Sequence, residues 1–220
     1  MQQLVLDIVP TPPPRFDNFI PAANAELVQA VNAIATQQNP EPQLYLWGDS
    51  GSGKTHLLQA SVHLALSRNN NAVYVDASEL AAIDPSAFEF IAIDNVERLG
   101  AADQIKLFNL INHMREGHGR LIAAGLIAPM QLPLRSDLTT RLGWGLVYQI
   151  HPLSDADKLS VLSRHAQARG FELHAGVADY LMRHWRRDLP SLIAALDSLD
   201  HYSLQTRRPI TVPLLKEVLG

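Results

Sequence analysis

One glycine-rich stretch carries the residues best suited to chemistry in this chain. Gly48, Gly53, Lys54 and Thr55 follow the P-loop pattern G-x-x-x-x-G-K-[ST], directly after a short apolar run. Glycines let backbone N–H groups turn inward around phosphate oxygens, and the positive end of a following helix attracts the same anion. Lys54 is expected to reach the β- and γ-phosphates, and the Thr55 hydroxyl to ligand Mg²⁺. The stretch predicts a nucleotide-binding loop made of Gly48, Ser50, Gly51, Ser52, Gly53, Lys54, Thr55 and His56.

A second candidate group follows the apolar run from Phe88 to Ile93. Asp94 closes this run and is expected to hold Mg²⁺ beside the phosphate loop, although a strand-end turn aspartate would look the same without that loop. The next residue, Asn95, stands where hydrolytic enzymes often carry an acid. An amide can align a water but cannot accept its proton, and Glu97 is a possible substitute that can face elsewhere. We therefore predict weak intrinsic hydrolysis.

Composition limits the remaining classes. The 220 residues, 47% of them hydrophobic, suffice for one large domain or two small ones with a buried core. The net charge of −4 and the pI of about 6.1 argue against an extended nucleic-acid surface, so direct DNA contact is expected to be weak or absent. The absence of cysteine excludes disulfides and thiolate metal sites. No apolar run is long enough to span a membrane, and the N-terminus does not have the pattern of a signal peptide. A cytoplasmic protein is therefore expected.

The hydrophobic pattern predicts the elements that position these residues. Apolar runs that read as strands end near 47, 75, 93, 124 and 150, and helices are expected over 25–38, 54–67, 101–116 and 138–142. This alternation predicts an α/β fold, a parallel sheet covered by helices on both faces. From residue 153 the pattern becomes helical only, with Ser154 as N-cap and Gly170 as stop of one helix, and further helices over 175–187, 190–205 and 213–219.

Arginines near the ends of these helices allow two interpretations each. Arg141 could be an arginine finger that reaches the γ-phosphate in a neighbouring subunit, or a surface arginine paired with Asp137. Arg186 and Arg187 could place a cation over the nucleotide, or be solvated charges. Spacing alone favours the simpler interpretation in both cases. Trp144, like Trp185, is expected to be a packing residue.

Several segments resemble the DnaA/Hda group of AAA+ proteins. Residues 53–60 (GKTHLLQA) look like the extended P-loop of DnaA, residues 16–19 (FDNF) with Asn24 resemble the segment before its first helix, and residues 140–146 (TRLGWGL) are similar to its arginine-finger box, with Thr140 in place of the usual serine. The resemblance covers about residues 15–205. It implies a P-loop AAA+ base followed by a small all-α lid, adds Phe16 and Asn18 to the nucleotide contacts, and favours Arg141 as a finger that acts in trans.

Within this group the chain looks most like the Hda branch. Residues 93–95 (IDN), 152–159 (PLSDADKL) and 169–173 (RGFEL) are similar to it, and we expect neither the DNA-binding domain nor the long N-terminal domain of DnaA. The resemblance implies a regulator that binds ADP or ATP with Mg²⁺ and stimulates hydrolysis of DnaA-bound ATP, which prevents re-initiation. It also implies self-association through AAA+ interfaces.

The first 14 residues are expected to form a tail and a proline spacer, ahead of a base over 15–152 and a lid over 153–220. By itself the apolar tail could dock on a partner or, preferably, on its own domain. However, residues 3–8 (QLVLDI) look like the motif with which Hda proteins bind the β subunit of the DNA polymerase sliding clamp. The resemblance therefore assigns Gln3, Leu4, Leu6 and Ile8 to clamp binding.

Two departures from the group affect catalysis. Residues 187–189 look like the start of the sensor II helix, which makes Arg187 the candidate to touch the nucleotide, but Pro190 and Ser191 differ from what usually follows. Residues 123–126 (AAGL) stand where a polar sensor I residue is expected. With Asn95 at the water-positioning place, this predicts a nucleotide-held switch. The alternatives are a self-sufficient ATPase, such as a helicase loader or remodelling motor, and an adaptor between clamp and DnaA without catalytic contribution.

Overall fold

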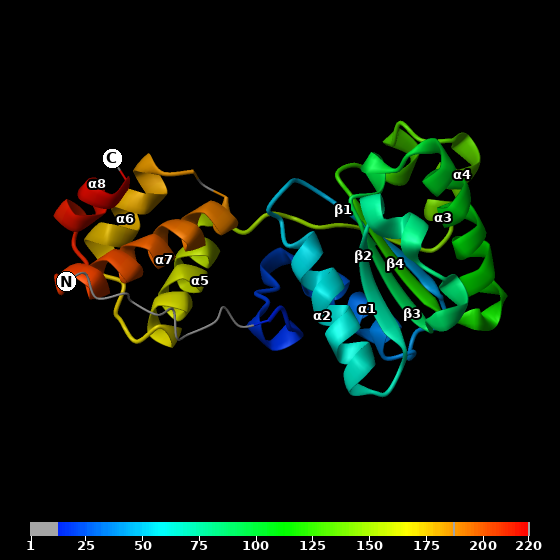
Figure 1. The fold of residues 1–220 in the computed structure, drawn as a ribbon, viewed down its shortest axis with the longest axis horizontal. Helices are drawn as coiled ribbons and strands as arrows, with labels where there is room; N and C mark the ends of the chain where they lie inside the picture. The colour runs from blue at the N-terminus through cyan, green and yellow to red at the C-terminus, as the bar shows by residue number, and fades with distance from the viewer. Residues whose placement is uncertain (1–12, 187, 220) are drawn as a thin grey trace. The chain divides into compact units, whose positions relative to one another are not determined.

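The computed structural model describes residues 13–186 and 188–219, which fall into two compact units, 13–152 and 153–219 (Figure 1). We call the first unit the base and the second the lid, and describe each by itself.

The base is built on a five-stranded parallel sheet, as the sequence predicts. Its strands are β1 (Gln43–Trp47), β2 (Ala72–Asp76), β3 (Phe90–Asp94), β4 (Arg120–Gly125) and β5 (Leu146–Gln149), in the order β2-β3-β4-β1-β5. Every pairing is parallel, and all five residues of β3 are buried because both faces of the sheet are covered. The carboxyl ends of β1 and β3 therefore meet at one edge, which brings the P-loop near Asp94.

Helices cover both faces and give the base two hydrophobic cores. The helices are α1 (Ala25–Ala35), α2 (Lys54–Ser67), α3 (Ala101–His113) and α4 (Ser136–Leu142). Side chains alternate along β1: Leu44 and Leu46 pack with α1 and α2, whereas Tyr45 packs with α3 and α4 on the other face. Short turns of 3-10 helix, among them η1 (Phe16–Asn18), η4 (Pro85–Ala87) and η5 (Val96–Arg98), connect the elements.

Several element boundaries in the base differ from prediction. The first helix stops at Ala35, not at residue 38, because Gln37 adopts the left-handed conformation (φ 59°). Strand β3 starts at Phe90, two residues late, because Phe88 closes the η4 turn with its N–H on the Pro85 carbonyl oxygen. Helix α3 ends at His113 and passes into one turn of π-helix, in which Gly117 is left-handed.

The lid consists of α5 (Asp155–Ala168), α6 (Ala175–His184), α7 (Leu189–Thr206) and α8 (Val212–Leu219) around its own core. Ser154 caps α5 in a reciprocal capping box with Asp157, which confirms the predicted start. Helix α6 ends at His184, three residues before the predicted end, because Trp185 is extended. Asp188 then caps α7 through the Ser191 N–H. No helix within the described ranges is long and apolar enough to cross a membrane.

The burial pattern of α2 yields a stability prediction. Leu58 is fully buried, whereas Leu66 on the same helix is 49% exposed. Truncating Leu58 to alanine should leave a cavity and lower the free energy of unfolding by about 2–5 kcal/mol, and the matched variant Leu66→Ala should change it by less than about 0.5 kcal/mol. Chemical denaturation followed by circular dichroism measures both. Equal losses in the two variants would contradict the orientation of α2.

Candidate functional site

The loop between β1 and α2 takes a path that requires glycine. A Cβ at Gly48 would lie 2.6 Å from the carbonyl oxygen of Ile150, and one at Gly53 would lie 2.8 Å from the Phe19 ring. Gly53 is also left-handed, with φ at 107°. The backbone of the loop is therefore held close to the end of β5 on one side and to the N-terminal segment on the other.

Hydrogen-bond donors converge on this loop. Helix α2 begins at Lys54, so the N–H groups of its first turn have no partner within the helix. Lys54 is buried, and its Nζ donates to the carbonyl oxygens of Gly48 (2.7 Å) and Asp49 (2.9 Å). The buried hydroxyl of Ser52 has no hydrogen-bond partner in the described part of the chain. Backbone amides, an ammonium group and an unsatisfied hydroxyl form a donor set that fits phosphate oxygens.

Electrostatics at Lys54 act in two directions. Burial lowers the pKa of Lys54, and the carboxylates of Asp94, Glu97 and Asp49 oppose this shift. Three acidic side chains thus act on one lysine, one from the P-loop itself, one from the last residue of β3 and one from η5. An anionic ligand at Lys54 would face the same acidic neighbours, which favours a bridging cation between them.

The two side chains assigned to Mg²⁺ lie in direct contact. The Thr55 hydroxyl donates to Oδ2 of Asp94 at 2.5 Å, and the Tyr74 hydroxyl donates to the same oxygen at 3.1 Å. Asp94 is only 1% exposed. In the described ranges no cluster of three His, Cys, Asp or Glu side chains could hold a metal. One hydroxyl and one carboxylate suit Mg²⁺, which usually takes its other ligands from phosphates and water.

Asn95 is turned toward a carboxylate that the sequence reading overlooked. Its backbone is left-handed (φ 57°), and its Nδ2 donates to Oδ2 of Asp76 at 2.6 Å. Asp76 closes β2, which lies beside β3 in register with Asp94. Hydrogen bonds from Ser78 are the largest cause of a lowered pKa at Asp76, which keeps it an acceptor for the Asn95 amide. The available signal was an aspartate at the end of a second apolar strand.

Glu97 lies at the end of β4 rather than away from the site. Its Oε2 accepts a hydrogen bond from the Leu126 N–H at 3.3 Å, and a Cβ built on Gly125 would lie 3.2 Å from the same oxygen. Glu97 also contributes to the raised pKa of Tyr45, after burial, and opposes the lowered pKa of Lys54. A carboxylate from η5 therefore stands where β4 itself supplies only apolar residues and glycine.

The N-terminal segment touches the P-loop through Phe19 and the backbone of Arg15. The Phe19 ring lies against Gly53 and 5.4 Å from the His56 ring, whose Nε2 is 3.0 Å from the Arg15 carbonyl oxygen. Burial lowers the pKa of His56. Asn18 is used locally: its side chain accepts from the Arg15 N–H and donates to the Pro13 carbonyl.

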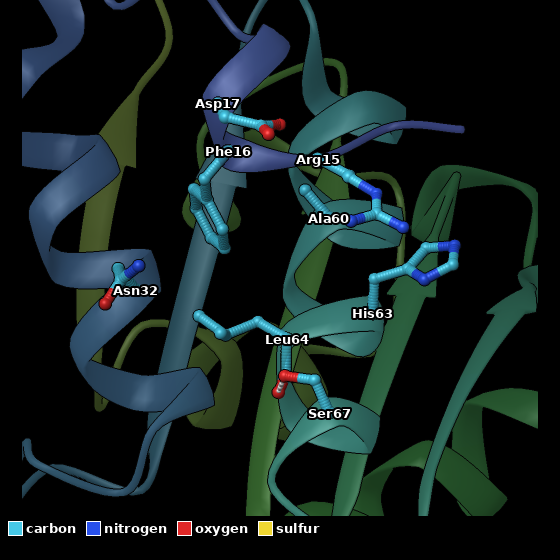
Figure 2. A pocket seen from close by; sticks show the side chains of 8 residues that line it. All are labelled: Arg15, Phe16, Asp17, Asn32, Ala60, His63, Leu64 and Ser67. Carbon is cyan, nitrogen blue, oxygen red and sulfur yellow. Dashed lines mark hydrogen bonds between the residues drawn. The ribbon is translucent and has the colours of Figure 1, made fainter. Parts of the chain in front are cut away.

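Phe16 faces a separate hollow of about 300 Å³ between η1, α1 and α2 (Figure 2). The lining residues are Arg15, Phe16, Asp17, Asn32, Ala60, His63, Leu64 and Ser67. None of them belongs to the loop from Gly48 to Thr55, so this hollow and the phosphate cradle are different places. Asn24 ties the segment to the base, since its side chain exchanges two hydrogen bonds with the backbone of His151 (2.9 and 2.7 Å).

Arg141 is not paired with Asp137, which instead bridges to Arg135 at 2.7 Å. The guanidinium carbon of Arg141 lies 3.6 Å from the centre of the Trp144 ring and 5.1 Å from that of Phe108. Trp144, expected to be a packing residue, is 47% exposed. Arg141 thus lies at the surface of the base on an aromatic support.

The backbone of Arg141 is anchored far from the P-loop of its own chain. The side-chain amide of Gln43 donates to the Arg141 carbonyl oxygen at 2.8 Å. Gln43 is the first residue of β1, whereas the P-loop follows the last, Trp47. A strand rises about 3.3 Å per residue, so about 13 Å separates the two ends of β1. The backbone of Arg141 and the P-loop therefore lie near opposite ends of β1.

Five predicted site residues fall outside the described residues. These are Arg187 in the lid and Gln3, Leu4, Leu6 and Ile8 in the tail. Their roles at the nucleotide and at the clamp stay predictions.

Comparison with known proteins agrees with this geometry. A family model for the bacterial DnaA ATPase domain matches residues 13–84, and one for the Hda lid domain matches residues 155–219. Domain III of the replication initiation protein DnaA from Thermotoga maritima is similar over 95% of this chain and 96% of its own, with a TM-score of 0.85 and 19% identity.

Two further structures share the fold. DnaA from Aquifex aeolicus bound to AMPPCP is similar over 85% of this chain and 65% of its own (TM-score 0.71, 21% identity). The Thermotoga maritima RuvB Holliday junction branch migration motor is similar over 94% and 71% (TM-score 0.72, 18% identity). With the P-loop sheet, the two family matches and these neighbours, the chain is a DnaA/Hda-like AAA+ protein.

Proposed function

We propose that this protein regulates the initiation of chromosome replication by stimulating the hydrolysis of ATP bound to DnaA. In this proposal Arg141 enters the nucleotide site of a DnaA subunit and stabilises the charge that develops on the γ-phosphate. The observation that carries the proposal is the position of Arg141, which is partly exposed, stacks on Trp144 and has its backbone anchored at the end of β1 opposite its own P-loop. An arginine placed there serves a neighbouring subunit.

The P-loop of the chain itself would hold ADP or ATP with Mg²⁺. The donor set at Lys54 and Ser52 and the contact between Thr55 and Asp94 support this assignment, as does the AMPPCP bound by the related DnaA of Aquifex aeolicus. The nucleotide would order the P-loop and the edge of the sheet to which it belongs. We infer a structural role for it, because Asn95 brings an amide rather than an acid to the water-positioning place.

Two partners follow from the same proposal. The match to the Hda lid domain supports DnaA as the AAA+ partner, and the surface around Arg141 would also allow self-association. The tail, with Gln3, Leu4, Leu6 and Ile8, would dock on the sliding clamp and so restrict the activity to clamps loaded on DNA. A protein of this kind acts in the cytoplasm with little direct DNA contact, in keeping with its net charge of −4.

One observation favours a second candidate, a self-sufficient ATPase. Glu97 brings a carboxylate to the end of β4, where it acts on Lys54. There it could orient the attacking water in place of the acid missing at position 95. This candidate predicts steady ATP turnover by the protein alone, whereas the regulator predicts turnover that appears only with DnaA.

The arginine assignment predicts a selective loss of activity. Arg141→Ala should lower the hydrolysis of DnaA-bound ATP, measured with DNA-loaded clamp, on the order of 100-fold or more. Arg135→Ala is the matched control, because this neighbouring arginine is already paired with Asp137. It should stimulate hydrolysis nearly as well as the wild type. If both variants behave alike, position 141 contributes only surface charge, and the finger proposal fails.

The tail assignment predicts a loss of clamp binding without a change in the base. A chain lacking residues 1–8 should no longer be retained by immobilised clamp, yet should bind labelled ADP as the full chain does. Leu6→Ala should weaken retention, whereas Val5→Ala, at a variable position of the motif, should have little effect. Undiminished retention of the shortened chain would place the clamp contact elsewhere.

A further inference from the structure

The turn after α4 places an indole ring against the Arg141 guanidinium. The backbone N–H of Trp144 donates to the Arg141 carbonyl oxygen at 3.2 Å. The backbone N–H of Gly143 donates to the Thr139 carbonyl oxygen at 3.1 Å. These bonds bend the chain back on the last turn of the helix. As a result the Trp144 ring lies 3.6 Å from the guanidinium carbon of Arg141.

The turn is restrained by hydrogen bonds from the side chain of Gln43. Gln43 is 1% exposed, and its side-chain amide donates to the carbonyl oxygens of Arg141 (2.8 Å) and Leu142 (3.3 Å). On the other side of Trp144, a Cβ at Gly145 would collide with the Gln43 carbonyl oxygen. Both flanks of Trp144 are therefore fixed to the first residue of a buried strand.

The position of the Arg141 side chain depends on the Trp144 ring more than that of Arg115 does. Arg115 also lies near Trp144, at 5.4 Å from the ring centre, but its guanidinium is paired with Glu41 at 2.9 Å. Arg141 has no ion-pair partner among residues 13–186 and 188–219, and its other aromatic neighbour, Phe108, is more distant. A long side chain without a partner loses rotamer entropy when it must adopt one position, and stacking on an aromatic face offsets this loss.

We propose that Trp144 is a positioning residue, which presents Arg141 in a preformed orientation for the neighbouring nucleotide site. This inference rests on the proposed function, because it assigns a support to the arginine finger. Trp144 itself touches no reacting group. Its effect is on the fraction of complexes in which the guanidinium is placed correctly, and hence on the rate within the complex.

The test compares a substitution that removes the aromatic ring with one that keeps an aromatic ring. Trp144→Leu removes the aromatic face, Trp144→Phe retains one, and both are compared with wild type and Arg141→Ala. Stimulated hydrolysis of DnaA-bound ATP is measured against the concentration of the regulator. Trp144→Leu should lower the rate at saturation about two- to tenfold with the half-saturating concentration unchanged, and Trp144→Phe should recover most of the rate. Thermal melting and ADP affinity should match wild type in both.

Other outcomes overturn the inference in distinguishable ways. A higher half-saturating concentration at an unchanged maximal rate would make Trp144 a docking residue. A further loss when Trp144→Leu is added to Arg141→Ala would show an effect that does not pass through the arginine. An unchanged rate in Trp144→Leu would mean that the ring is dispensable. If Arg141→Ala itself stimulates normally, the proposed function fails, whatever Trp144 does.

Discussion

Strand β1 is the constraint on which the two functional ends of the base depend. It is buried between β4 and β5, so neither its register nor its direction can change without breaking the sheet. Its last residue leads into the phosphate loop, and its first residue, Gln43, holds the carbonyls at the end of α4. One rigid element thus fixes the phosphate-loop backbone at one end and a partly exposed arginine at the other. In the proposed function, such a base receives a nucleotide at one end and acts on another subunit with the other.

Acidic groups do lie around the P-loop, but at positions other than the one directly after Asp94. The place after Asp94 carries an amide bonded to Asp76, and the polar group expected at the end of β4 is supplied by Glu97. Burial lowers the pKa of Lys54, and three carboxylates oppose the shift. The arrangement can bind a nucleotide with a bridging cation, but it lacks the acid directly after Asp94 that rapid hydrolysis often uses. This favours a nucleotide that supports structure over one that is turned over.

Much of the fold and part of the site could be predicted from sequence, because both depend on local patterns. The parallel sheet covered by helices follows from the α/β alternation, α2 has the predicted bounds, and the capping box at Ser154 marks the first lid helix. The misses arise from contacts between distant residues. Gln43 and Arg141 are 98 positions apart, and no local pattern shows that the amide of one holds the backbone of the other. Likewise, nothing in the segment around Asn95 shows that Asp76 is its partner.

The central claim, a nucleotide cradle around Lys54, is tested most directly by binding. Titration of the purified protein with fluorescent ADP, with and without Mg²⁺, should show saturable binding that Lys54→Ala weakens on the order of 100-fold. The matched variant His63→Ala, which changes a residue of α2 facing the separate hollow, should bind as the wild type does. Equal affinity of the Lys54→Ala variant and the wild type, or loss of binding only in the His63→Ala variant, would contradict the account.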